Sequence, residues 1–266
     1  MQTSTESVIL HYDLVGDDSH DPILFVHGFP LAGEMWRPAA ERICGDGWRC
    51  VLPDLRGHGR SDTTAEASIR AYADDLAHLL DNLGETQPAV VCGLSMGGVI
   101  TLEFYRRYPH RVRGMVLCDC RATPETPEGR DERRAVAQRV LDEGNGPLAE
   151  QMIAKLFAPG ADRTLRDYWQ ERIAATNPIG VITALKALAE RPDAVPTLAT
   201  INVPTLLVFG TRDVISPPEV GRQMQAAIPN SRLDLVSDAG HLPPLEQPDV
   251  FADALRRFLA EVRESE

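Results

Sequence analysis

The feature that most constrains this fold is a short apolar run that ends in a glycine-flanked serine. Residues 89–98 read Ala-Val-Val-Cys-Gly-Leu-Ser-Met-Gly-Gly, and an amphipathic segment follows directly. This pattern is typical of a strand, a sharp turn and a helix, with the serine hydroxyl presented at the turn. Because Gly93 and Gly97 lack Cβ atoms, the strand and the helix can approach closely around Ser95. The bland alternative is a glycine-rich turn that holds a serine by chance.

The pattern around this turn favours the first interpretation. Strand-like segments at 8–15, 23–26, 50–52 and 112–118 alternate with helical patterns at about 33–44, 68–83 and 96–108. This alternation predicts a doubly wound, mostly parallel α/β sheet. The carboxyl ends of parallel strands meet at one edge of the sheet, which is where such sheets bind ligands. Four polar residues are expected at that edge, namely His27, Asp54, Ser95 and Asp119.

The pattern changes at about residue 122 and resumes at about residue 200. We therefore divide the chain into a first part of the α/β core (1–121), a helical cap or lid insertion (122–200) and a second part of the core (201–266). A strand at 205–210, a helix from 217 to about 228, a strand at 232–236 and a helix at about 248–262 are expected in the last part. The insertion is rich in apolar and aromatic residues, which predicts an apolar pocket beneath it.

A serine hydroxyl becomes a good nucleophile only when a general base accepts its proton, and a carboxylate usually orients that base. In α/β sheets that present a serine nucleophile on a glycine-flanked turn, the chain order is serine, then the acid, then histidine. Asp213 follows the strand at 205–210 and His241 follows the strand at 232–236, so both are expected beside Ser95. Asp119 also ends a strand, and it remains an alternative for the orienting acid.

The oxyanion that forms during acyl transfer needs two N–H donors. The backbone N–H of Met96 lies at the start of the expected helix, where the helix dipole favours negative charge. The second donor in this fold comes from the loop after the strand at 23–26. Phe29 is our candidate, because Gly28 leaves space beside it and Pro30 has no N–H. His27 begins the same loop and is expected to brace it.

Composition limits the classes of molecule that this chain is expected to bind. The formal net charge of −12 argues against nucleic acid and anionic membranes. The five cysteines are odd in number and their spacing suggests no metal site, so free thiols in a reducing cytoplasm are expected. No secretory signal and no apolar run long enough to span a bilayer are visible. We expect no cofactor, a small-molecule ester as the partner, and a monomer or small homo-oligomer.

With these residues assembled, the chain resembles the α/β-hydrolase fold family over essentially its full length. The resemblance lies in His27-Gly28-Phe29-Pro30, in residues 54–61 (Asp-Leu-Arg-Gly-His-Gly-Arg-Ser), in Gly93 to Gly98, in residues 210–213 and in residues 238–244. Within the family the chain is most similar to small bacterial carboxylesterases, which are related to 3-oxoadipate enol-lactonases and cofactor-free haloperoxidases. Ser95 stands where haloalkane dehalogenases and epoxide hydrolases carry an aspartate, which argues against those two reactions.

The resemblance implies a serine carboxylesterase that hydrolyses short-to-medium acyl esters through an acyl-enzyme. Ser95, His241 and Asp213 would form the triad, with Phe29 and Met96 as the oxyanion hole. A lactonase acting on an anionic enol-lactone, or a perhydrolase, would use the same triad, and Arg121 would be the basic group of the lactonase. A non-catalytic ligand-binding protein of the same fold is the remaining alternative. The candidate pocket residues are His27, Arg121, Leu156 and Trp169.

Overall fold

Parallel strands that are buried on both faces form the centre of the molecule. The computed structural model describes residues 8–264 and contains a seven-stranded sheet in the order β1-β3-β2-β4-β5-β6-β7. β1 is antiparallel to β3, and every other neighbouring pair is parallel. The strands are β1 (Tyr12–Val15), β2 (Asp21–Val26), β3 (Trp48–Pro53), β4 (Ala89–Leu94), β5 (Val112–Cys118), β6 (Thr205–Gly210) and β7 (Ser231–Val236).

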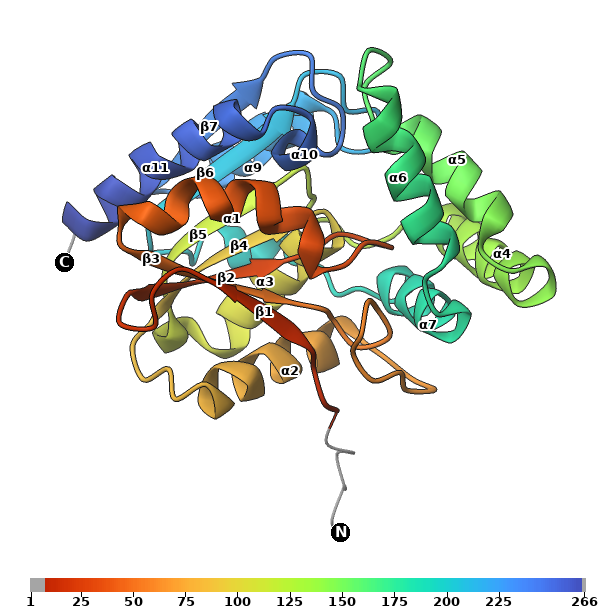
Figure 1. The fold of residues 1–266 in the computed structure, drawn as a ribbon, viewed down its shortest axis with the longest axis horizontal. Helices are drawn as coiled ribbons and strands as arrows, with labels where there is room; N and C mark the ends of the chain where they lie inside the picture. The colour runs from red at the N-terminus through yellow and green to blue at the C-terminus, as the bar shows by residue number, and fades with distance from the viewer. Residues whose placement is uncertain (1–7, 265–266) are drawn as a thin grey trace, which may run out of the picture.

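Helices cover both faces of this sheet (Figure 1). They are α1 (Arg37–Ile43), α2 (Ile69–Asn82), α3 (Met96–Arg107), α9 (Pro218–Ala227), α10 (Pro243–Glu246) and α11 (Pro248–Glu264). Three short 3-10 helices within residues 8–264 are η1 (Gly33–Trp36), η2 (Cys44–Asp46) and η3 (Pro109–Arg111). Among the helices of the described residues, none combines the length and apolar character required to span a bilayer.

The apolar runs of the central strands are continuous because these strands pack on both sides. In β2, Ile23 and Phe25 belong to the core formed with α1 and α11. The alternate residues Leu24 and Val26 belong to the core formed with α2 and α3. Such two-sided burial is the reason that central parallel strands show no polar alternation.

The first strand is shorter than the sequence pattern at 8–15 suggests, since pairing with β3 begins only at Tyr12. The preceding residues bind the loop that follows β3 instead. The N–H of Asp62 donates to the carbonyl of Ile9, and the N–H of Asp54 donates to the carbonyl of His11. The Ser61 hydroxyl accepts from the N–H of His11. These contacts hold the loop against the chain ahead of β1 and use the groups that a longer strand would need.

Five helices lie between β5 and β6, and the first four of them gather beyond one end of the sheet (Figure 1). We call them the cap: α4 (Pro127–Glu143), α5 (Gly146–Leu156), α6 (Arg163–Ala174), α7 (Pro178–Ala189) and α8 (Val195–Leu198). α4 packs on α7, and α5 packs on α6. Side-chain oxygens of Thr126, Asp162 and Asn177 accept backbone N–H bonds at the starts of α4, α6 and α7. These N-terminal hydrogen bonds show why new helices begin at those three points of the insertion.

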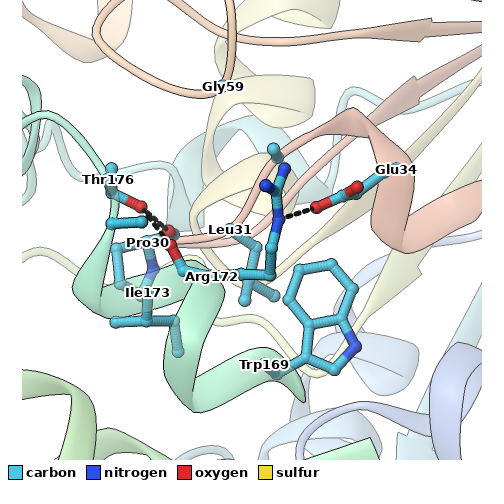
Figure 2. A pocket seen from close by; sticks show the side chains of 10 residues that line it. Pro30, Leu31, Glu34, Gly59, Trp169, Arg172, Ile173 and Thr176 are labelled. Atoms are coloured by element: carbon cyan, nitrogen blue, oxygen red, sulfur yellow. Dashed lines mark hydrogen bonds and ion pairs between the residues drawn. The ribbon is translucent and has the colours of Figure 1, made fainter.

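The cap contacts the core through polar groups on α6 and the segment after it (Figure 2). The guanidinium of Arg172 donates to the carboxylate of Glu34 at 2.5 Å. The hydroxyl of Tyr168 donates to the same carboxylate at 3.2 Å. The hydroxyl of Thr176 lies 3.4 Å from the carbonyl oxygen of Pro30, in the loop after β2. The cap is therefore tied to the loop that carries Phe29.

A second contact between cap and core depends on two glycines. Gly180 of α7 meets Gly57, which lies in the loop after β3 and has a φ of +78°. A Cβ atom on Gly180 would lie 1.7 Å from the carbonyl oxygen of Gly57, so the two backbones touch directly. This approach allows α7 to lie against the core, and any side chain at position 180 would force the two apart.

We therefore expect Gly180→Ala to lower the free energy of unfolding by about 1–3 kcal/mol, as overpacked sites do. This result would oppose the intrinsic helix preference, which favours alanine over glycine by roughly 1 kcal/mol. Gly146→Ala is the matched control, because Gly146 also belongs to a helix but a Cβ atom there would meet no neighbour. Chemical denaturation of both variants measures the effect, and equal stabilisation by the two alanines would contradict the expectation.

Candidate active site

The serine turn adopts the strained geometry that its sequence predicts. Ser95 directly precedes α3 and has φ and ψ of 54° and −113°, a conformation that non-glycine residues rarely adopt. A Cβ atom at Gly97 would lie 2.1 Å from the carbonyl oxygen of Val26, and one at Gly93 would lie 2.3 Å from the carbonyl oxygen of Gly97. The turn therefore requires glycine on both sides of the serine. The N–H of Ser95 donates to the carbonyl of Cys118 at 2.9 Å, which joins the turn to β5.

His241 and Asp213 form a buried pair at the same edge of the sheet. Asp213 follows β6, His241 follows β7, and the distance from Nδ1 of the imidazole to Oδ2 of the carboxylate is 2.7 Å. The other carboxylate oxygen accepts from the N–H of Ile215 at 2.7 Å. Burial alone would raise the pKa of Asp213. The charge and hydrogen bond of His241, together with the N–H of Ser216, hold that pKa below its ordinary value.

Ser95 and His241 line one common cavity. The hydrogen bonds of residues 8–264 do not include one between these two side chains. Such contacts are often long in a free enzyme and shorten when substrate binds. The arrangement of nucleophile, base and acid along the chain is the order expected for this fold. It can support proton transfer from a serine hydroxyl to a histidine that a carboxylate orients.

Asp119, the alternative acid, lies beside Asp213 and does not reach the imidazole in place of it. Its Oδ1 accepts from the N–H of Gly210 at 2.9 Å. One side-chain atom each of Asp119, Asp213 and His241 lies within 4.8 Å of the other two, and a set of this kind could ligate a cation. A cation bound there would compete with the hydrogen bond between His241 and Asp213.

The loop that carries His241 is fixed by Glu246, a residue whose role the sequence leaves open. One carboxylate oxygen accepts from the N–H groups of Gly240 and Leu242, at 2.8 and 3.3 Å. The other accepts from the N–H of Ala158, just after α5 of the cap, at 2.8 Å. The sequence shows only an acidic residue at the start of a helix, and helix capping alone would explain that pattern. The structure shows that Glu246 holds both neighbours of the histidine and joins them to the cap.

The two expected oxyanion donors come from two different elements beside the serine. Met96 is the first residue of α3, and Phe29 follows β2. Both line the cavity that Ser95 and His241 share. A Cβ atom on Gly28 would lie 3.4 Å from Cβ of Ser95, so the loop of Phe29 lies directly beside the serine. These positions fit a pair of N–H donors around one developing charge, which stays a prediction.

The shared cavity has a volume of about 570 Å³ and lies between the core and the cap. Its core side includes Phe29, Ser95, Met96, Arg121 and His241. Its cap side is formed by α4, α5 and α7. The cap residues that line it are Glu125, Gly129, Glu132, Arg133, Val136, Leu148, Gln151, Met152, Lys155, Leu185, Leu188 and Arg191. The lining combines apolar and charged side chains, so the cavity is less uniformly apolar than the sequence predicts.

Arg121, predicted to lie in the pocket, does line this cavity. The other three pocket candidates lie elsewhere. His27 is completely buried below the loop: its Nε2 accepts from the N–H of Leu55, and its Nδ1 faces the carbonyl of Gly28. Leu156 packs into the core beside β4, and its carbonyl accepts from the N–H of His241 at 2.8 Å.

Trp169 lines a separate, small pocket of about 70 Å³ between α6 and the loop after β2 (Figure 2). These three expectations require correction, and the reason is physical. Helical periodicity shows that Leu156 and Trp169 face inward, but it does not show whether the partner is a cavity or the core. The histidine that begins the loop after β2 is used to hold that loop, as the hydrogen bonds of His27 show.

Two buried histidines couple this loop region to pH. Burial lowers the pKa of His27 to about 4. Burial and the adjacent His27 lower the pKa of His58 to about 3. The rings lie 5.1 Å apart, so a charge on one would also oppose a charge on the other. Both imidazoles are neutral in the folded protein at neutral pH.

From these pKa values we expect the protein to lose stability as the pH falls from about 6.5 toward 4. In that range the unfolded chain binds protons that the folded protein does not, so each histidine contributes a slope of about 1.4 kcal/mol per pH unit. His58→Asn should reduce the slope by about that amount, because it removes one of the two titrating groups. The asparagine amide N–H can replace the Nδ1–H bond to the carbonyl of Arg56, so the loop should keep its structure. Urea unfolding between pH 4 and 7 measures it, with the exposed His110→Asn as control.

Comparison with known proteins agrees with the fold. The family model for the alpha/beta hydrolase fold matches residues 21–248. A solved thermophilic esterase from Thermogutta terrifontis, in a malate-bound structure, is 41% identical with a TM-score of 0.94 and covers 98% of this chain and 96% of its own. A pimeloyl-[acyl-carrier protein] methyl ester esterase from Neisseria meningitidis is 29% identical, over 91% of this chain and 94% of its own length. The 3-oxoadipate enol-lactonase 1 of Acinetobacter baylyi is 27% identical, over 99% of this chain and 97% of its own length. The chain therefore belongs to the α/β-hydrolase fold family.

Proposed function

We propose that this protein is a serine carboxylesterase that hydrolyses short-to-medium acyl esters of small molecules. The carrying observation is the cavity in which Ser95 and His241 meet, with Asp213 bound to the far side of the imidazole at 2.7 Å. The esterase relatives described above support ester hydrolysis as the reaction class. Five cysteines that form no disulfide support a cytoplasmic location, which remains a prediction.

In this mechanism the hydroxyl of Ser95 attacks the ester carbonyl while His241 accepts its proton. The oxyanion of the tetrahedral intermediate binds the N–H groups of Met96 and Phe29. Collapse breaks the ester bond, and His241 gives the proton to the leaving alcohol. His241 then activates a water molecule that attacks the acyl-enzyme, which releases the acid and restores the serine. Asp213 holds the imidazole in the required tautomer and stabilises its charged form.

The cavity supports the expected acyl length. Its apolar lining residues include Val99 of α3, Leu148 and Met152 of α5, and Leu185 and Leu188 of α7. A volume of about 570 Å³ exceeds what an acetyl group needs and lies within the range of small-molecule sites. Acyl chains of short to medium length would bury their methylenes against this surface, each contributing about 0.8 kcal/mol.

We expect Ser95→Ala to reduce kcat for p-nitrophenyl butyrate on the order of 10³-fold or more, because the covalent path is lost. Ser237→Ala is the matched control, since that serine is exposed and follows β7 at the same end of the sheet. A fluorophosphonate probe should label wild-type protein at position 95 and leave the variant unlabelled. Turnover by the alanine variant close to that of wild type would contradict the mechanism. Absence of labelling in folded wild-type protein would favour a binding protein.

One observation favours a second candidate, hydrolysis of an ester or lactone that carries a carboxylate. The chain has a net charge of −12, yet four basic and two acidic side chains line the cavity. Arg133 and Arg191 share the carboxylate of Glu125, at 2.6 and 2.7 Å. Arg121 donates to the carbonyl of Ile215 and forms no ion pair with a described residue, so it can receive an anionic substrate group. The malate-bound esterase structure and the enol-lactonase among the relatives support this candidate.

The two candidates differ in what Arg121→Gln should do. If the cavity binds a carboxylate, this variant should raise KM for mono-p-nitrophenyl succinate about 10-fold, the size expected for one lost charged hydrogen bond. KM for the neutral p-nitrophenyl pentanoate serves as the internal control and should change less than about twofold. A parallel change for both esters would show that Arg121 acts only through the loop of Ile215. The neutral ester would then remain the better description of the substrate.

A further inference from the structure

Two carboxyl groups, those of Asp119 and Asp213, lie together in the interior behind His241. We propose that Asp119 is a positioning residue whose neutral carboxyl group donates a hydrogen bond to the carboxylate of Asp213 and thereby holds it against the imidazole. The proposal rests on the roles proposed above for Ser95, His241 and Asp213. It assigns to Asp119 a part in the same site that is distinct from that of the orienting acid.

The position of Asp119 is built by the sheet. The residue directly follows β5, and its N–H donates to the carbonyl of Val208 in β6 at 3.0 Å. Its φ is 42°, an uncommon value for a residue other than glycine. Its side chain is completely buried, and Oδ1 accepts from the N–H of Gly210 at 2.9 Å. Strain of this kind persists where the surroundings fix the conformation, which is common at functional sites.

The second oxygen of Asp119 shows where the hydrogen bond goes. Oδ2 is buried, and within the described part of the chain it has no donor. A carboxylate oxygen in that position would carry an uncompensated charge, which is costly in a protein interior. Asp119 and Asp213 each offer an oxygen within 4.8 Å of the other and of the imidazole. A proton on Asp119 would turn the oxygen that lacks a partner into a donor, and the carboxylate of Asp213 offers an acceptor oxygen in the same cluster.

The distribution of donors decides which aspartate holds the proton. Asp213 receives hydrogen bonds from His241, from the N–H of Ile215 and from the N–H of Ser216. Asp119 receives one, from Gly210. Two buried carboxylates this close cannot both be ionised without a large cost, so the poorly solvated one takes the proton. Complete burial, the charge of Asp213 and the nearby Cys118 thiol all raise the pKa of Asp119 well above its ordinary value.

The consequence concerns the orientation of Asp213. Its Oδ1 is held by the N–H of Ile215 on its own loop, and its Oδ2 contacts His241. The hydroxyl of Asp119 adds a contact from a different strand, which fixes the loop after β6 relative to the edge of β5. A correctly oriented carboxylate is what keeps the imidazole in the tautomer that can accept a serine proton. Loss of Asp119 should therefore impair catalysis more than substrate binding.

Asparagine and glycine at position 119 separate this role from the alternatives. The amide of Asp119→Asn can accept from Gly210 through its oxygen and donate to Asp213 through its nitrogen, as a neutral carboxylic acid does. Both replacements tolerate a positive φ, so neither adds backbone strain. We expect Asn to keep kcat for p-nitrophenyl butyrate within about threefold of wild type. Gly should lower kcat by roughly 10-fold to 100-fold, with little change in KM.

Asp238 provides the matched controls. It also follows a strand at this edge and has a positive φ of 58°, but it is exposed, and its ion-pair partner among residues 8–264 is Arg212. Asp238→Asn and Asp238→Gly should leave kcat unchanged. Thermal unfolding of all four variants shows whether any loss of kcat follows a loss of folded protein. A kcat that falls as far in Asp119→Asn as in Asp213→Asn would overturn the proposal, since it would make Asp119 a charged acid of the triad.

A measurement that needs no turnover tests the neutral carboxyl group directly. Infrared difference spectra between wild type and Asp119→Asn at pH 7 should show a protonated carboxylic acid band that the variant lacks. Its absence would overturn the proposal, and so would a divalent cation bound stoichiometrically by wild type and lost in the variant. If the band is present while wild type hydrolyses no ester, the proposed function fails and the arrangement of the two aspartates stands.

Discussion

The close approach of α3 to the sheet is the constraint on which the rest of this site depends. Gly97 places the first turn of the helix against the end of β2, and Gly93 leaves room for that turn at the end of β4. The strained backbone of Ser95 is the result, and it points the residue toward the edge where the parallel strands end. The loop of Phe29 lies beside it because it continues the strand that the helix touches. Nucleophile and candidate oxyanion donors are thus placed by one packing contact.

The cap lines the cavity and also holds the loop that carries His241. Glu246 accepts N–H bonds from both neighbours of His241 and from Ala158 after α5, while the carbonyl of Leu156 accepts from His241 itself. Movement of α5 would therefore change the position of His241, the candidate base. The cavity joins an apolar surface to charged groups of the cap and Arg121. Under the proposed function, the apolar surface would bind the acyl chain and the charged groups would discriminate among esters.

Much of the fold and of the candidate site could be predicted from local patterns. Apolar runs with β-α alternation indicated the parallel sheet, and the end of each run marked the edge where Ser95, Asp213 and His241 lie. The pocket was harder to predict. Leu156 and Trp169 face inward as their helical periodicity indicates, but a cavity and a packed core give the same periodicity. The extent of the first strand was overestimated, because residues 8–11 bind the loop 54–62 and not a neighbouring strand.

The sequence by itself determined the order of chemistry along the chain: a serine between glycines, then an aspartate, then a histidine, each after a strand. Those features follow from local steric demands and from the short reach of a loop. They can therefore be recognised from residues that are close together in the sequence. Only the tertiary structure decided which aspartate contacts the imidazole, what Glu246 holds, and which cap residues face the cavity. Asp119 and Asp213 are 94 residues apart in the chain. Their contact depends on the pairing of β5 with β6 and on burial from water, which no local pattern records.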